Sequence, residues 1–222
     1  MNSMVYELIR KDWRLNRVAV ATGVILGILA LALVQLGGEV PFVVGAVCFY
    51  TVLGVLASLL PQNIYNEQKN QTRAFVMSLP VSPVQYTIAK LISTVGVFLL
   101  AWLTLVGVAS SVIAGREQIP NGTIPFMVVL AAMVLVGFTL ICAVGMVAEK
   151  EGYAIATMIG CNLFYSLGWY FLIRLPEVNQ YLGGPNVVWS PFLVTVIAVE
   201  FLLITLVLAL TLYLQTRKQN VI

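Results

Sequence analysis

The chain contains no histidine, and only 9% of its 222 residues are charged. Without histidine there is no His-based acid–base catalyst, no Ser-His or Cys-His nucleophilic site and no His-ligated metal. Soluble domains carry roughly 25% charged residues, far more than this chain. Hydrophobic residues make up 60% of the sequence and its mean hydropathy is +0.98, so it predicts a polytopic membrane protein.

Cysteine is also scarce, and its spacing matches neither a metal site nor a disulfide framework. Cys48, Cys142 and Cys161 lie inside apolar runs, where we expect them to pack as small apolar side chains. The net charge of +3 comes from basic residues beside apolar runs rather than from one patch, which does not favour nucleic-acid binding. We expect no metal or cofactor bound by this chain.

Proline is missing from the interiors of six apolar runs. A transmembrane helix needs about 20 apolar residues, and proline breaks helix interiors. All nine prolines fall at or beyond the ends of these runs. We therefore predict an all-α protein with a single transmembrane domain over residues 1–222. Its six spans are 18–36, 40–60, 91–114, 124–148, 153–175 and 191–214.

Residues 1–17 form an amphipathic stretch ahead of the first predicted span. Leu8 and Trp13 belong to its apolar set, and Arg10 and Arg14 to its charged set. This pattern predicts an interfacial helix lying at the membrane surface. A signal peptide is the competing interpretation, but the first apolar run is too long for a signal core and five more follow.

The distribution of Lys and Arg predicts the orientation. With both termini cytoplasmic, all of the twelve basic residues except Arg116 and Arg174 lie on the cytoplasmic side. The segment 61–87, between the second and third spans, is then cytoplasmic. It is the longest polar stretch between apolar runs, and such connections are usually short.

Segment 61–87 has the local pattern of an ordered structure. One helical face is formed by residues spaced i, i+3, i+4 and i+7: Thr72, Phe75, Val76 and Leu79. Pro80 ends that helix, and Ser82 to Gln85 matches a capping box with proline at the first helical position. A new helix is therefore expected from Ser82. The amphipathic helix either docks a soluble partner or lies on the lipid headgroups.

Glu200 is an acidic residue deep inside the last predicted span. It lies nine residues after Pro191, roughly 13–14 Å along a helix. A carboxylate at that depth needs a proton or a partner, and Arg174 is a candidate partner. Glu200 is either a substrate or proton site or a polar lock between helices.

Other groups inside the spans suggest a path or a packing surface. Candidates for a translocation path are Tyr50, Thr51, Asn162, Tyr165 and Ser166. Equally, such groups often just bond across helices. Small residues form two stripes that permit close helix approach, within the chain or between subunits: Gly23 and Gly27, and Gly152, Ala156 and Gly160.

The segment Glu67…Thr72…Met77-Ser78-Leu79-Pro80-Val81-Ser82…Lys90 resembles the signature of type-2 ABC (ATP-binding-cassette) exporter permeases. The stretch Lys11-Asp12-Trp13-Arg14-Leu15-Asn16-Arg17 is similar to the N-terminal interfacial helix of that family. Pro83 departs from the pattern, since many relatives have Arg or Lys there.

The resemblance implies a permease subunit in a bacterial-type plasma (inner) membrane. Two permease chains, expected to be a homodimer, would pair above two copies of a separate ABC ATPase, which would bind ATP and Mg. The chain has no GxxxxGK[ST] motif, so we expect it not to be an enzyme itself. The cytoplasmic coupling helix would contact the ATPase through Glu67, Lys69, Thr72, Arg73, Phe75, Val76, Leu79 and Pro80. Spans two and five would flank the path.

The expected function is therefore export of an amphipathic or hydrophobic substrate, such as a lipid, peptide or drug. A non-transporting membrane subunit, such as an assembly or immunity factor, is the alternative. An integral membrane enzyme is disfavoured, because no cluster of ionisable groups lies at one membrane depth.

Overall fold

The computed structural model describes residues 3–36, 38–69, 82–116, 119–148 and 151–219. Its helices are α1 (Ser3–Val34), α2 (Glu39–Leu59), α3 (Gln62–Lys69), α5 (Pro83–Ala114), α6 (Thr123–Val147), α7 (Glu151–Leu172), α8 (Pro176–Leu182) and α9 (Pro191–Gln219). Among the described helices, α1, α2, α5, α6, α7 and α9 are long and apolar enough to cross a membrane. The predicted all-α fold with six spans is confirmed.

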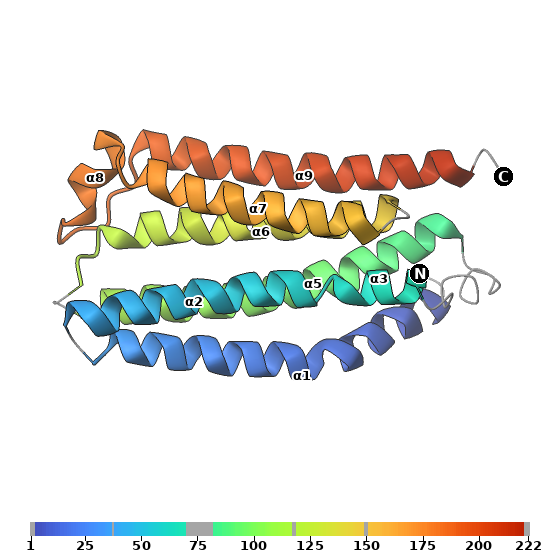
Figure 1. The fold of residues 1–222 in the computed structure, drawn as a ribbon, viewed down its shortest axis with the longest axis horizontal. Coiled ribbons are helices and arrows are strands. Elements are labelled where there is room, and N and C mark those ends of the chain that lie inside the picture. Colours follow the sequence, from blue (N-terminus) through green and yellow to red (C-terminus); the bar gives the residue numbers. More distant parts are fainter. Residues whose placement is uncertain (1–2, 37, 70–81, 117–118, 149–150, 220–222) are drawn as a thin grey trace.

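The spans form two groups that run side by side (Figure 1). In one group α1 packs against both α2 and α5, and in the other α6 packs against α7 and α9. Helix α6 also contacts α2 and α5, so it joins the groups. The two chain ends lie at one end of the bundle, together with α3, and α8 lies at the other end (Figure 1). We call these the terminal end and the α8 end.

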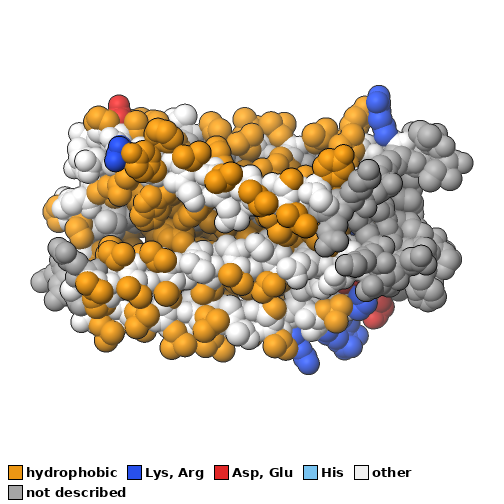
Figure 2. All heavy atoms as spheres, in the orientation of Figure 1, with side chains coloured by type: hydrophobic (Ala, Val, Ile, Leu, Met, Phe, Trp, Pro, Cys, Tyr) orange, Lys and Arg blue, Asp and Glu red, His pale blue; other side chains and the backbone are white. Residues whose placement is uncertain are grey.

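Helix α6 is central because it is apolar all round, as expected of a helix buried on every side. Val129, Leu130 and Ala131 are fully enclosed. Phe138 of α6 stacks on Phe98 of α5, with ring centroids 4.0 Å apart. The outer faces of the other spans carry apolar side chains along most of their length, and the charged side chains in view lie toward the ends (Figure 2).

Helix α5 begins as its sequence predicts. Ser82 is the N-cap: its hydroxyl accepts a hydrogen bond from the Gln85 backbone N–H, and the Gln85 side chain accepts one from the Ser82 N–H. Pro83 follows at the start of the helix. This reciprocal capping box satisfies two backbone donors and fixes where α5 begins.

Two features differ from the expected boundaries. Residues 1–17 do not form a separate helix, since α1 continues unbroken into the first span and only its first turns curve away from the rest (Figure 1). Its placement at a membrane interface stays a prediction. The connection between the last two predicted spans, residues 176–190, begins with α8, where Val178 is buried. Pro176 at the first turn favours that helix start.

Candidate functional site

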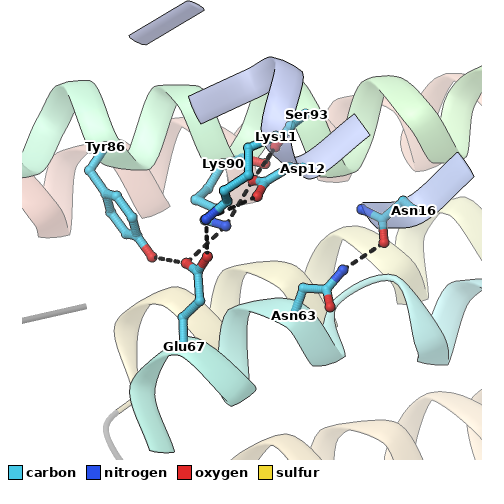
Figure 3. A network of polar contacts seen from close by, with 8 residues as sticks. All are labelled: Lys11, Asp12, Asn16, Asn63, Glu67, Tyr86, Lys90 and Ser93. Carbon is cyan, nitrogen blue, oxygen red and sulfur yellow. Dashed lines mark hydrogen bonds and ion pairs between the residues drawn. The ribbon is translucent and has the colours of Figure 1, made fainter. Parts of the chain in front are cut away.

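At the terminal end, a buried lysine joins three helices. Lys90 of α5 is only 2% exposed, and its Nζ lies 2.7 Å from Asp12 Oδ2 of α1 and 2.8 Å from Glu67 Oε2 of α3 (Figure 3). Asp12 is 3% exposed. One ammonium therefore bridges two carboxylates from distant parts of the sequence, in a place where water screens little.

Further donors surround both carboxylates, although Asp12 Oδ1 has no hydrogen-bond partner among the described residues. Glu67 Oε1 accepts from Lys11 Nζ at 2.8 Å, and Glu67 Oε2 accepts from the Tyr86 hydroxyl at 2.8 Å. Asp12 Oδ2 accepts from the Ser93 hydroxyl at 3.0 Å, and Lys11 Nζ lies 3.7 Å from Asp12 Oδ1. The Lys90 network, as we call it, consists of Lys11, Asp12, Glu67, Tyr86, Lys90 and Ser93. Its two carboxylates and two ammonium groups balance in charge, which a buried ion cluster requires.

Helical periodicity brings these side chains together. Tyr86, Lys90 and Ser93 are spaced i, i+4 and i+7, so they share one face of α5. On α1, Asp12 and Asn16 are buried one turn apart, and Arg10 and Arg14 are exposed. Asn16 Oδ1 accepts from Asn63 Nδ2 of α3 at 2.6 Å, which is a second tie between α1 and α3 (Figure 3).

The predicted coupling residues fall into two sets. Glu67 lies within the Lys90 network, so its carboxylate is bound to this chain's own helices. Lys69 ends α3, and its side chain is outside the described residues, as are the other predicted contacts: Thr72, Arg73, Phe75, Val76, Leu79 and Pro80. The network therefore joins the two flanks of segment 70–81, because Glu67 precedes that segment and Tyr86 follows it. We call this junction the base of the segment.

A cleft of about 710 Å³ opens between α2 and α7, with α6 as its floor. The face shown in Figure 2 is hollowed between these two helices. Its walls run from Phe42 to Leu59 on α2 and from Cys161 to Trp169 on α7. We call it the α2–α7 cleft. Among the predicted path residues, Tyr50, Thr51, Asn162 and Tyr165 line it, which brings together residues far apart in the sequence.

Aromatic side chains gather on one part of the cleft wall. The Tyr50 ring centroid lies 5.9 Å from those of Tyr165 and Trp169, and Trp169 meets Phe126 at 5.5 Å. The Tyr50 hydroxyl donates to the Met127 carbonyl at 3.1 Å. The Tyr165 hydroxyl is enclosed and has no hydrogen-bond partner among the described residues. The two tyrosines therefore differ, because only the Tyr50 hydroxyl is satisfied within the chain.

Two other predicted path residues are not part of the cleft wall. Ser166 is exposed on α7 and donates to the carbonyl of Asn162 in its own helix. Glu200 is buried on α9, and neither carboxylate oxygen has a hydrogen-bond partner in the described part of the chain. Arg174 does not pair with it as suggested. Its guanidinium, in the turn after α7, lies 4.0 Å from the centre of the Tyr170 ring near the end of that helix.

Asp12 belongs to the stretch that resembles the family's N-terminal helix, but no sequence pattern assigned it to a site. The available signal was an acidic residue between the basic residues Lys11 and Arg14, one turn from Asn16. Trp169 was missed because tryptophan in a span is usually a packing residue or an interfacial anchor.

Residues 39–168 match the family described as "ABC-2 family transporter protein". The chain belongs to the ABC-2 family. The match includes α2, α3, α5 and α6 whole, and α7 up to Gly168, so Glu67, Lys90 and nearly all of the cleft wall lie inside it. No curated protein and no solved structure matches the chain.

Membership of the ABC-2 family indicates a multi-pass membrane permease of an ABC transporter, and it implies association with an ABC ATPase. The resemblance described from the sequence motif is thereby confirmed at the level of the family. Asp12 and Lys11 lie before the matched residues, whereas Glu67 and Lys90, which they contact, lie within them.

Proposed function

We propose that this ABC-2 protein is the membrane-spanning permease subunit of an ATP-driven exporter that moves an amphipathic or hydrophobic substrate out of the cytoplasm. The observation that carries the proposal is the Lys90 network at the base of segment 70–81. A separate ATPase subunit binds and hydrolyses ATP with Mg, and the chain itself is not an enzyme.

Segment 70–81 is where we place the docking surface for the ATPase. The chain leaves α3 at Lys69 and is capped into α5 at Ser82. Glu67 before the segment is held by Tyr86 and Lys90 after it, so the two flanks are joined at their base. A displacement of the segment therefore reaches α5 directly and reaches α1 through Asp12. In this proposal Glu67 anchors the docking segment to α5 and α1. Phe75, Val76 and Leu79 contact the ATPase.

The α2–α7 cleft is our candidate for the substrate path. It is lined by spans two and five, as the family resemblance implies, and its wall runs along most of the membrane-spanning length of α2. Movement of α1 and α5 reaches the cleft because α1 packs on α2, and α5 packs on α6, its floor. The cleft thus lies one helix away from the elements that the network moves.

A second permease chain completes the exporter in this proposal, with two ATPase subunits below. A Cβ added at Gly152 or Gly160 of α7 meets no atom within 4 Å, whereas one added at Gly23 or Gly27 of α1 meets leucine side chains. The small-residue stripe of α7 is therefore free for a close helix contact with another copy, as small residues permit in membranes. We expect a homodimer.

The terminal end faces the cytoplasm of a bacterial-type cell in this proposal. Arg10, Arg14 and Arg217 are exposed there, and cytoplasmic flanks carry an excess of such residues. The exposed Trp13 beside these arginines suits a headgroup region. The proposed orientation puts segment 70–81 where a soluble ATPase can reach it.

Purification in a mild detergent from the native host tests the function. A stoichiometric ABC ATPase should co-purify with the wild-type chain and be lost with Phe75→Asp. Thr216→Asp is the matched control, because Thr216 is exposed at the same end outside the segment. If no ATPase co-purifies while other membrane complexes remain intact, the chain is a non-transporting subunit and the proposal fails.

A further inference from the structure

The α2–α7 cleft has a lining without charge. None of the residues that line it in the described part of the chain is Asp, Glu, Lys or Arg. The buried charges of the bundle lie elsewhere: Asp12, Glu67 and Lys90 pair at the terminal end, and Glu200 is on α9. An ionised group that entered the cleft would lose its hydration without gaining a counter-ion, which costs several kcal/mol in a membrane.

The polar side chains of the lining show how much hydrogen bonding the cleft offers. Thr51 and Ser58 each donate to the carbonyl four residues earlier in α2, and the Tyr50 hydroxyl is used by Met127. Asn162 donates to the Met158 carbonyl through Nδ2, which leaves its side-chain oxygen as an acceptor. Tyr165 adds a hydroxyl that has no partner.

These two remaining groups lie close together along the chain. Asn162 and Tyr165 are spaced i and i+3 on α7, so they share a face of the helix. Tyr165 lines the cleft, and its hydroxyl is enclosed beside it. A buried hydroxyl without a partner is unfavourable, and a ligand that supplies an acceptor removes that cost.

The shape of the cleft favours a long and narrow occupant. Its α2 wall extends from Phe42 to Leu59, about 25 Å at the helical rise of 1.5 Å per residue. The hydrocarbon core of a bilayer is about 30 Å thick. A volume of about 710 Å³ is within the range of roughly 300–1,000 Å³ that holds one ligand of drug size. One extended hydrocarbon chain fits this length and volume.

We propose that the α2–α7 cleft binds an uncharged single-chain amphiphile, with its hydrocarbon chain along α2 and α6 and its hydroxyl or ester group at Tyr165 and Asn162. The inference rests on the proposed exporter function, because it names the substrate class for the path of that exporter. It excludes amphiphiles whose ionised headgroup must enter the cleft.

The test uses the full chain in lipid nanodiscs without ATPase or ATP, and brominated probes that quench tryptophan fluorescence on contact. Subtracting the quenching of a Trp169→Phe variant isolates the signal of Trp169 on the cleft wall. The probes share one brominated chain and differ in headgroup: a monoacylglycerol, the fatty acid, the alkylamine, and an alkane without headgroup. The monoacylglycerol should quench Trp169 saturably, at a mole fraction at least about tenfold below that of either charged probe.

Two matched variants test the proposed hydrogen bond between the Tyr165 hydroxyl and the probe. Tyr165→Phe keeps the ring and removes the unpartnered hydroxyl, so it should weaken monoacylglycerol binding about three- to tenfold and leave alkane binding unchanged. Tyr170→Phe makes the same change on the same helix outside the cleft and should alter neither.

Three results would overturn the inference: quenching that only follows bulk mole fraction, charged probes that bind as well as the monoacylglycerol, or no effect of Tyr165→Phe. None of them bears on ATPase docking, because the assay contains no ATPase. Conversely, loss of the co-purifying ATPase would defeat the proposed function and leave probe binding as measured.

Discussion

Helices α1 and α7 both carry a stripe of small residues along a membrane span, and the two helices use it differently. On α1, a Cβ added at Gly27 would lie 2.5 Å from Leu105 Cδ2, because the groove is filled by this chain. On α7, Gly160 faces open space. The buried acid of α1, Asp12, is ion-paired, whereas the enclosed hydroxyl of α7, Tyr165, has no partner among the described residues.

The difference shows that α1 has its contact partners within one chain, whereas α7 leaves some of its groups without partners among the described residues. Helix α1 finds its packing and its ionic partners in α2, α3 and α5, and so forms a rigid unit with them. Helix α7 packs mainly on α6 and leaves groups unused. Unused small and polar groups within a membrane span indicate a contact that another molecule supplies.

Removal of the bridging Lys90 ammonium tests most strongly whether the ionic partners of α1 within this chain stabilise the fold. Lys90→Met keeps the chain length and leaves two carboxylates buried with one fewer cation. We expect a loss of about 3–5 kcal/mol in the free energy of unfolding, measured by SDS titration in mixed micelles. Arg217→Met, at an exposed arginine near Tyr213, is the control and should cost less than about 0.5 kcal/mol. Equal small effects would show that the network contributes little to stability.

Substituting the two glycine stripes compares their faces directly. Gly27→Val overpacks the contact with Leu105 and should lower the free energy of unfolding by about 1–3 kcal/mol. Gly160→Val has room within the chain, so it should leave unfolding unchanged and instead weaken the proposed dimer. Unfolding in mixed micelles and the mass of the detergent-solubilised complex measure the two effects. A Gly160→Val chain that dimerises normally would remove α7 from the subunit interface.

The two tyrosines of the cleft offer the smallest and most specific contrast. Tyr50→Phe removes the hydrogen bond from the Tyr50 hydroxyl to the Met127 carbonyl and should destabilise the empty protein by about 1 kcal/mol. Tyr165→Phe removes a hydroxyl that has no partner and should leave the stability unchanged or slightly higher. Thermal unfolding of both variants in the same detergent makes the comparison. A larger loss from Tyr165→Phe would mean that its hydroxyl is bound within the chain.

Much of this fold could be predicted from local sequence. Apolar runs bounded by proline predict the spans, since run length and proline chemistry act within one helix. The capping box at Ser82 was predictable for the same reason. The partnership of Asp12 with Lys90 was not, because no local pattern says which distant helix a buried acid will meet. Helix α8 was missed because its seven residues, about two turns, are too few to show a period.

The candidate site was predictable only in part. Tyr50 and Asn162 were grouped by the family resemblance, and the structure brings both to one cleft. Glu67 was expected to contact a partner directly, yet its carboxylate is held within the chain. The predicted docking residues from Thr72 to Pro80 lie outside the described part, so their role stays a prediction.

The proposed coupling between the Lys90 network and the α2–α7 cleft is tested most directly by a signal from the cleft in the presence of the ATPase. Trp169 fluorescence is recorded in the complex of permease and ATPase with and without ATP, for the wild-type chain and for Glu67→Gln. We expect Glu67→Gln to retain the ATPase, since segment 70–81 is unchanged, but to lose the ATP-dependent change at Trp169, since the anchor is weakened. A variant that keeps the full change, or that releases the ATPase, would contradict the anchoring role of the Lys90 network.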